Sequence, residues 1–241
     1  MRVLHFFKAA IPDSVGGTER VINQIARATR TFGVESSVLS LSTAPGPRSV
    51  EVDGYTTHRV KLNFEIASTG FSLGAFSRFK ELARESDVIH YHYPWPFMDL
   101  VHFVSRLKKP TVLTYHSDII RQNRLIHLYR PLQARFLADV SRIVATSSNY
   151  VASSEVLKRY ASKLSVIPIG LDKATYPKPS IERLNYWRDR VGDRFFLFVG
   201  VLRYYKGLHI LIEAARRTNF PIVIVGAGPI EYALIKHCLL Y

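Results

Sequence analysis

The chain has 241 residues, of which 47% are hydrophobic and 22% charged, a composition that is typical of folded proteins and excludes a disordered polypeptide. Cys238 is the one cysteine, which excludes an internal disulfide within this sequence and favours a reducing compartment. A net charge of +14 favours an anionic partner. Because no helix-turn-helix, zinc-ligand or RNA-binding signature accompanies it, we expect no nucleic acid and favour anionic lipid head groups.

The chain begins with the pattern of a strand followed by a helix. Residues 1–7 predict a buried strand, and residues 18–32 predict a helix capped by Thr18. The expected apolar face of this helix comprises Val21, Ile25, Ala28 and Phe32. Gly16 and Gly17 end the intervening loop, where glycines let the backbone pass close to a ligand; a tight turn without a ligand is the alternative.

The next segment continues the alternation of strands and helices. Gly33 ends the first helix, and residues 34–41 predict a second strand. Residues 50–62 predict a strand or hairpin around the turn dipeptide Asp53-Gly54, and residues 73–84 predict a helix. Residues 63–74 have only a weak pattern.

A histidine-rich strand follows at residues 87–93 and runs into an aromatic loop that contains Trp95 and two prolines. His90 and His92 are two residues apart, so in a strand both face the same way. Zinc binding is rejected because two histidines without a third ligand at a usual spacing make a poor site. Packing or hydrogen bonding is the favoured role of the pair.

Residues 110–115 predict another buried strand, and His116 follows it directly. Open α/β sheets bind ligands outside the carboxyl ends of their strands, so His116 is expected at a ligand-binding crevice. A purely structural histidine is the alternative.

A helix is predicted over residues 121–139, with Pro131 starting a second segment. Its expected apolar stripe comprises Leu125, Leu128, Leu132 and Phe136. Arg124 and Arg135 flank this stripe, so the helix either faces the core with solvated arginines or lies on an anionic membrane surface.

The remainder predicts strands at residues 142–146 and 163–168 around a helix at residues 150–160, and then a proline-containing linker. Residues 195–199 form an apolar run typical of a strand buried on both faces. A loop with Arg203 and Lys206, a helix and a strand at residues 221–225 complete a βαβ unit. Cationic side chains beside a helix N-terminus suit a phosphate group.

Five short motifs resemble those of family-4 glycosyltransferases with the GT-B fold. They are the Gly16-Gly17-x-Glu19 loop, LTYHSD at residues 113–118, PIGLD at residues 168–172, FVGVLRYYKG at residues 198–207 and IVGAGP at residues 224–229. The resemblance implies an α/β protein of GT-B type, with an N-terminal Rossmann-like, acceptor-side domain at residues 1–170. A linker at residues 171–192 and the first βαβ unit of a second Rossmann-like domain, at residues 193–241, would follow.

The resemblance also implies a retaining transfer of a hexosyl group, such as mannose, from a GDP- or UDP-sugar to a lipid-linked glycan in lipopolysaccharide assembly. His116 would contact the donor sugar, and Tyr93 and Trp95 would lie on the acceptor side. Gly16, Gly17, Arg203, Lys206 and Gly228 would bind the donor; Arg203 substitutes for the usual arginine, whose position holds Val201. Without an Asp-x-Asp pair, neither a metal nor another cofactor is expected.

A usual family member continues through several more βαβ units and a pair of glutamates, so we expect the second domain to be truncated and the activity impaired. The alternative is a non-catalytic remnant, or one subunit of a split enzyme that binds membrane or a partner. A dinucleotide-dependent oxidoreductase is disfavoured because Glu231 stands where a third glycine is needed after Gly226 and Gly228. With no signal-peptide core and no run of about 18 apolar residues, a cytoplasmic, membrane-peripheral location is expected.

Overall fold

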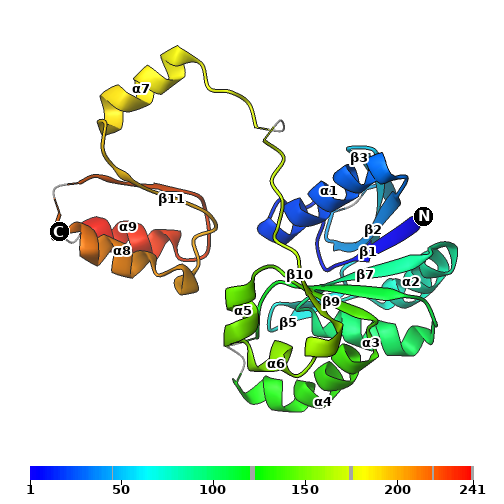
Figure 1. Ribbon diagram of the computed structural model, residues 1–241. Coiled ribbons are helices and arrows are strands. Elements are labelled where there is room, and N and C mark those ends of the chain that lie inside the picture. Colours follow the sequence, from blue (N-terminus) through cyan, green and yellow to red (C-terminus); the bar gives the residue numbers. More distant parts are fainter. Residues whose placement is uncertain (45, 120–122, 174–175, 219, 240–241) are drawn as a thin grey trace. The chain divides into compact units, whose positions relative to one another are not determined.

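A computed structural model of the chain describes residues 1–44, 46–119, 123–173, 176–218 and 220–239. The chain divides into two compact units, which we call unit 1 (Met1–Asp172) and unit 2 (Lys173–Tyr241). Figure 1 shows both, and each is considered by itself.

Unit 1 is built on an eight-stranded sheet with the order β10-β9-β8-β7-β1-β2-β4-β3. All neighbouring strands are parallel except β3, which pairs antiparallel with β4. The strands are β1 (Arg2–Phe6), β2 (Glu35–Ser42), β3 (Ser49–Val52), β4 (Tyr55–Lys61), β7 (Val88–Tyr93), β8 (Thr111–Tyr115), β9 (Arg142–Ala145) and β10 (Leu164–Val166). A separate short hairpin joins β5 (Phe64–Ile66) to β6 (Thr69–Phe71).

Helices cover the sheet on both faces. They are α1 (Gly17–Thr29), α2 (Leu73–Glu85), α3 (Pro96–Ser105), α4 (Asn123–Asp139), α5 (Ser148–Ser153) and α6 (Glu155–Lys158), with short 3₁₀ turns at Arg30–Phe32 and Ala161–Lys163. The two core clusters divide at β2: Val38 packs with Ile22 of α1, whereas Leu39 packs with side chains of α2, α3 and α4. Since successive strand residues point to opposite faces, α1 lies on one face of the sheet and α2–α4 on the other.

The order of strands changes direction at β1, which pairs with β2 on one side and with β7 on the other. Such a switch point leaves a crevice at the carboxyl ends of the two strands, where the loops depart to opposite sides. The loops after β1, β7 and β8 therefore lie at one edge of the sheet, as Figure 1 allows the reader to follow.

The structure corrects the predicted apolar face of α1. Phe32 is 84% exposed, and the buried side chains are instead Glu19, Ile22, Asn23 and Ala26. The face is rotated because two of its polar side chains find hydrogen-bond partners: Ser14 donates to Glu19, and Asn23 donates to Tyr55 and Asp53. The helix cap also differs, since Gly16 rather than Thr18 precedes the first helical residue.

Other local predictions need correction as well. Pro131 lies inside the continuous helix α4 and starts no second segment. Residues 150–160 contain two short helices, because Ser154 ends α5 and caps α6 with its side chain. The hairpin β5–β6 lies where the sequence pattern was weak. By contrast, the turn at Asp53-Gly54 is confirmed: both residues have positive φ, and the turn joins β3 to β4.

Unit 2 contains α7 (Ile181–Val191), β11 (Phe196–Val199), a 3₁₀ turn (Tyr204–Lys206), α8 (Leu208–Ala215), β12 (Ile222–Val225) and α9 (Glu231–Leu239). Helix α7 lies within the segment predicted as a linker. The strands β11 and β12 pair in parallel, and α8 and α9 contribute Leu208, Ile212 and Leu234 to a small core.

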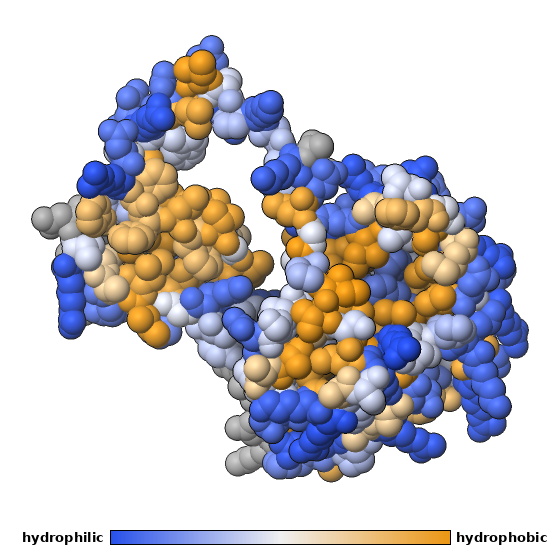
Figure 2. Space-filling view, in the orientation of Figure 1, coloured by the Kyte–Doolittle hydropathy of each residue, from blue (hydrophilic) through white to orange (hydrophobic). Residues whose placement is uncertain are grey.

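The prediction that the apolar run 195–199 is buried on both faces is wrong. Leu197 is 58% exposed and Val199 is 68% exposed, because a two-stranded sheet with helices on one side leaves its other face uncovered. The face of unit 2 that is in view in Figure 2 is accordingly largely hydrophobic. Among the described residues, no helix is both long and apolar enough to cross a membrane.

The rotated face of α1 can be tested by truncating one residue from each candidate face. Ile22→Ala should lower the free energy of unfolding of unit 1 by about 2–5 kcal/mol, because Ile22 is 1% exposed and its removal leaves a cavity. Phe32→Ala should change it by less than about 0.5 kcal/mol. Urea denaturation of both variants measures the difference, and a larger loss for Phe32→Ala would restore the predicted face.

Candidate functional site

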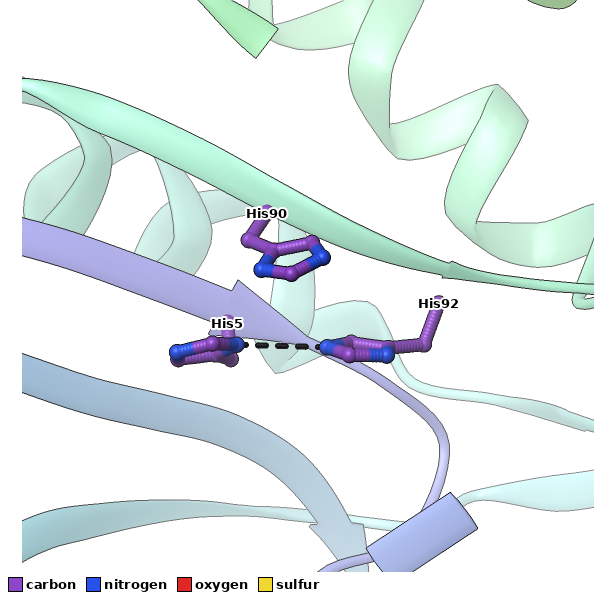
Figure 3. Close-up of side chains that lie close together, drawn as sticks. All are labelled: His5, His90 and His92. Atoms are coloured by element: carbon purple, nitrogen blue, oxygen red, sulfur yellow. Dashed lines mark hydrogen bonds between the residues drawn. The ribbon is translucent and has the colours of Figure 1, made fainter. Parts of the chain in front are cut away.

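Four imidazole rings gather near the carboxyl edge of the sheet in unit 1. His5 comes from β1, His90 and His92 come from β7, and His116 follows β8. Strand register brings them together, since His5 lies opposite His90 and His92 lies opposite Thr114. Nδ1 of His5 lies 3.2 Å from Nε2 of His92, and Nδ1 of His92 lies 3.2 Å from Nε2 of His116. Figure 3 shows the first of these contacts.

These histidines are neutral at physiological pH because they are removed from water. Burial lowers the pKa of His5 and that of His116 to about 4. Burial lowers the pKa of His90 and that of His92 well below the usual value, and the neighbouring histidines lower both further. A neutral imidazole has one N–H donor and one acceptor nitrogen, so each ring can both donate and accept within the cluster.

The cluster supplies the third histidine whose absence was the reason for rejecting zinc. Ligand nitrogens of His5, His90 and His92 lie within 4.8 Å of one another. Tetrahedral zinc with bonds of about 2.0–2.1 Å requires nitrogens roughly 3.4 Å apart, with every lone pair directed at the ion.

The geometry fits stacking better than metal binding. The rings of His90 and His92 are stacked at 4.5 Å, and Nε2 of His90 lies 2.8 Å from the Thr114 hydroxyl. Figure 3 shows His90 lying over the other two rings, so its in-plane lone pairs do not converge with theirs. In this arrangement the three rings are oriented for stacking and hydrogen bonding rather than for a shared metal ion.

His116 is partly buried at the edge expected for a ligand. Its backbone N–H donates to the carbonyl of Tyr93, which ties the loop after β8 to the end of β7. Two residues later, Asp118 accepts hydrogen bonds from Tyr115 and Ser154. Hydrogen bonds therefore fix the loop both at His116 and at Asp118.

Tyr93 and Trp95, which were predicted for the acceptor side, do not present their side chains at the surface. Their side chains are 0% and 1% exposed and belong to the core. The Trp95 indole donates to the carbonyl of Gly70, and the Tyr93 ring stacks on Tyr115 at 4.4 Å. An aromatic loop after a strand suggested a binding surface, but these rings instead anchor the loop.

Gly16 and Gly17 differ in what surrounds them. A Cβ atom on Gly16 would lie 2.5 Å from a carboxylate oxygen of Glu19, whereas a Cβ on Gly17 would meet no atom within 4 Å. Gly16 therefore makes room for the carboxylate of Glu19, which would have to shift if the residue carried a side chain. Gly17 faces open space at the start of α1, where no side chain caps the helix.

In unit 2, the basic loop lies between β11 and α8. Arg203 and Lys206 are both exposed, and among the described residues neither forms an ion pair. Nζ of Lys206 lies 5.5 Å from the centre of the Tyr205 ring. Gly207, with φ of 68°, is the N-cap of α8, so the cationic groups precede a helix N-terminus.

Gly228 lies where the loop after β12 packs closely against the basic loop after β11, so no open space surrounds it. A Cβ atom on Gly228 would lie 2.4 Å from the carbonyl oxygen of Leu202, and one on Gly226 would lie 1.9 Å from that of Gly200. The Leu202 N–H also donates to the carbonyl of Ala227. Both glycines are needed because the loops after β11 and β12 touch through their backbones.

Helix α4 carries the predicted membrane-surface arginines. The side chain of Arg124 lies outside the described residues, as does that of Leu125. Arg135 is exposed, with its guanidinium carbon 5.1 Å from the centre of the Phe103 ring. Leu128 was predicted in the core-facing stripe, but it is 82% exposed, whereas Phe136 is buried. Because Leu128 and Arg135 are two turns apart, they share a side of the helix.

A cavity of about 540 Å³ opens elsewhere in unit 1. It is lined by the first residues of three strands, Arg2, Glu35 and Tyr55, and thus lies at the amino ends of the strands. None of the predicted site residues lines it. Ligands of open α/β sheets bind at the opposite edge, so the histidine-bearing edge is the better candidate.

Comparison with known proteins identifies the family. The sequence profile of Glycosyltransferase Family 4 matches residues 15–175. The chain belongs to glycosyltransferase family 4. It is 56% identical over 234 residues to D-rhamnosyltransferase WbpZ of Pseudomonas aeruginosa, and 52% identical over 234 residues to O-antigen chain mannosyltransferase C of Escherichia coli. The matches cover 97% and 96% of this chain but only 61% and 62% of those relatives.

Solved structures agree with a family-4 protein of GT-B type. Sucrose-phosphate synthase from Thermosynechococcus elongatus matches with a TM-score of 0.70 and 17% identity, over 99% of this chain and 68% of that one. Anabaena HepE in complex with UDP-glucose matches with a TM-score of 0.67 and 18% identity, over 100% of this chain and 65% of that one. The predicted α/β, GT-B fold is confirmed.

The buried histidines of this family-4 chain make its stability depend on pH. The pKa of His5 is about 4 in the folded state and about 6.5 when unfolded, so acidification protonates the unfolded chain first. The contribution of His5 to stability is present above pH 6.5 and is lost as the pH falls toward 4.

The unsubstituted chain should lose stability as the pH is lowered from 7 to 4, in part because of His5. His5→Leu removes this contribution, so the variant should lose about 3 kcal/mol less unfolding free energy over the same range. Leu39→Ala, which removes a buried apolar side chain, should lower stability equally at both pH values. Urea titrations across this range provide the measurement. An identical pH dependence of His5→Leu and the unsubstituted chain would contradict the burial of a neutral His5.

Proposed function

We propose that this family-4 chain acts in the transfer of a hexosyl group, with mannose as the first candidate, from a GDP- or UDP-sugar to a surface glycan. The observation that carries the proposal is the exposed pair Arg203 and Lys206 on a loop that leads into the N-terminus of α8. The names of the two relatives, a D-rhamnosyltransferase and an O-antigen mannosyltransferase, support a hexosyl or deoxyhexosyl donor and a lipid-linked O-antigen acceptor.

In this proposal the basic loop of unit 2 serves the leaving group. Sugar transfer separates an oxocarbenium-like anomeric carbon from a diphosphate, on which negative charge develops. Arg203, Lys206 and the start of α8 in unit 2 stabilise that charge, as cationic and N–H groups do for leaving groups in general. In unit 1, the candidate donor-contacting groups are His116 and the open backbone at Gly17, considered apart from unit 2.

Two details of the proposal rest on the resemblance to the family. Retention of anomeric configuration is one of them. The other is the absence of a bound metal, since cationic side chains take over the neutralisation of the diphosphate. The proposed location is the cytoplasmic face of a membrane, where α4 presents Leu128 and Arg135 to anionic lipid.

Substituting Lys206 tests the donor site. Lys206→Met should weaken GDP-mannose or UDP-glucose binding about 10- to 100-fold, because a charge-assisted hydrogen bond to phosphate contributes about 1.5–3 kcal/mol. Isothermal titration of the full chain with each nucleotide sugar measures this loss.

The matched control is Lys236→Met, which removes an exposed lysine from α9 in the same unit. It should leave the affinity unchanged. Equal weakening by both substitutions would mean that the effect comes from the net charge of the protein and not from Lys206 at a specific site. If the unsubstituted chain shows no saturable binding, the donor-site proposal is wrong.

The proposed membrane surface of α4 predicts a second effect. Arg135→Gln should lower partition onto vesicles of mixed phosphatidylglycerol and phosphatidylcholine about fivefold, since one cation near an anionic surface contributes about 1 kcal/mol. Arg20→Gln, an exposed arginine of α1, is the control and should have little effect. Vesicle sedimentation at low salt measures both. If Arg20→Gln lowers partition as much as Arg135→Gln, α4 is not the binding surface.

A further inference from the structure

Three of the histidines form a continuous hydrogen-bonded row that ends at the sheet edge. His5 contacts His92, and His92 contacts His116, through alternating Nδ1 and Nε2 atoms. The row crosses three adjacent strands, from β1 through β7 to the end of β8. His90 stacks on this row but bonds to Thr114 and is not a link in it. We call His5, His92 and His116 the histidine row.

A row of neutral imidazoles allows only two arrangements of its protons. Either each Nδ1 carries the proton and donates toward His116, or each Nε2 carries it and donates toward His5. The two arrangements differ at the ends of the row. The first leaves Nε2 of His5 as a bare acceptor and gives His116 a donor at Nδ1, whereas the second leaves Nε2 of His5 as an N–H.

The buried end of the row decides between them. Nε2 of His5 is buried and has no hydrogen-bond partner among the described residues. Among backbone groups, buried N–H groups without an acceptor are rarer than carbonyl oxygens with unused acceptor capacity, and we apply the same preference to the imidazole nitrogens. The arrangement with an unprotonated Nε2 on His5 is therefore the more stable one.

We infer that His5 and His92 are positioning residues that fix the tautomer of His116, so that its Nδ1 presents an N–H donor at the carboxyl edge of the sheet. Nδ1 of His116 forms no hydrogen bond with the described residues and is available to a ligand. Its partner would be an oxygen acceptor of the donor sugar, such as a hydroxyl group. That partner rests on the proposed function; the tautomer itself does not.

The burial of His116 determines the charge of the hydrogen-bond donor that it offers. Since the pKa of His116 is about 4, the ring is neutral at pH 7 and offers an oriented donor rather than a cation. Which nitrogen of a histidine carries the proton is set by the hydrogen bond that the other nitrogen makes. Here that bond comes from His92, whose own proton is held in place by His5.

Nitrogen-15 NMR of the full chain labelled at its histidines can test this assignment, because the two tautomers differ in which ring nitrogen is protonated. The chain has nine histidines, so His116→Gln is used to assign the resonances of His116. At pH 7.5 we expect the Nδ1–H tautomer at His116. Protonation of Nε2 instead would overturn the proposal.

Two substitutions at His92 separate hydrogen bonding from packing. His92→Asn places an amide donor where Nδ1 was and should retain the Nδ1–H tautomer of His116. His92→Phe retains a flat ring without nitrogen and should shift His116 to Nε2–H. The control His90→Phe, which alters the stack but not the row, should leave His116 unchanged. No shift in His92→Phe, or an equal shift in His90→Phe, would overturn the proposal.

Ligand binding then tests the partner of the donor separately. His92→Phe should weaken GDP-mannose binding about five- to tenfold, the effect of one neutral hydrogen bond, and leave GDP binding unchanged. If the tautomer shifts as expected but both affinities stay the same, the row exists and the sugar contact is wrong. If the unsubstituted chain binds neither ligand, the proposed function fails while the NMR result still decides the tautomer.

Discussion

The parallel pairing of β1, β7 and β8 is the constraint on which the candidate site of unit 1 depends. Its register places His5 opposite His90 and His92 opposite Thr114, so polar rings from distant parts of the sequence form one layer. A slip of one residue in any of these strands would turn its histidine to the opposite face. Three of the four rings lie in the buried sheet, and the loop that carries His116 is tied to it because the His116 N–H donates to the carbonyl of Tyr93 at the end of β7.

Several polar groups within this core are tolerated because they bond to one another, although Nε2 of His5 has no partner among the described residues. Neutral imidazoles donate and accept along the row, and elsewhere Gln133 donates to the Tyr93 hydroxyl. An unpaired polar group buried in the same place would cost about 1–3 kcal/mol. A buried imidazole layer of this kind keeps its rings neutral, since protonating one would place a charge where little water reaches it. The chemistry of His116 is thereby restricted to hydrogen bonding near neutral pH.

The sequence predicted the strands well because long apolar runs have few alternatives, and it predicted His116 because a side chain directly after a parallel strand lies at the ligand-binding edge. It missed His5, which is separated from His92 by 87 positions and carries no local signal of its partner. It also misplaced the face of α1, since Asn23 is buried only because Tyr55 and Asp53 accept its amide. The burial of Tyr93 and Trp95 could not be predicted, because aromatic residues after a strand look the same in a sequence whether they face a ligand or anchor a loop.

In unit 2, the placement of the basic loop does not depend on how much of the sheet is covered. Leu197 and Val199 of β11 are largely exposed, so the strand gains little from burial. The loop after β11 is instead fixed by backbone contacts that only glycine permits, between Gly226 and Gly200 and between Gly228 and Leu202. Those contacts lie within a few residues of Lys206 and of the α8 N-terminus. The geometry of the basic loop is therefore a local property of the βαβ unit, and covering the bare strand face would add stability without moving the cations.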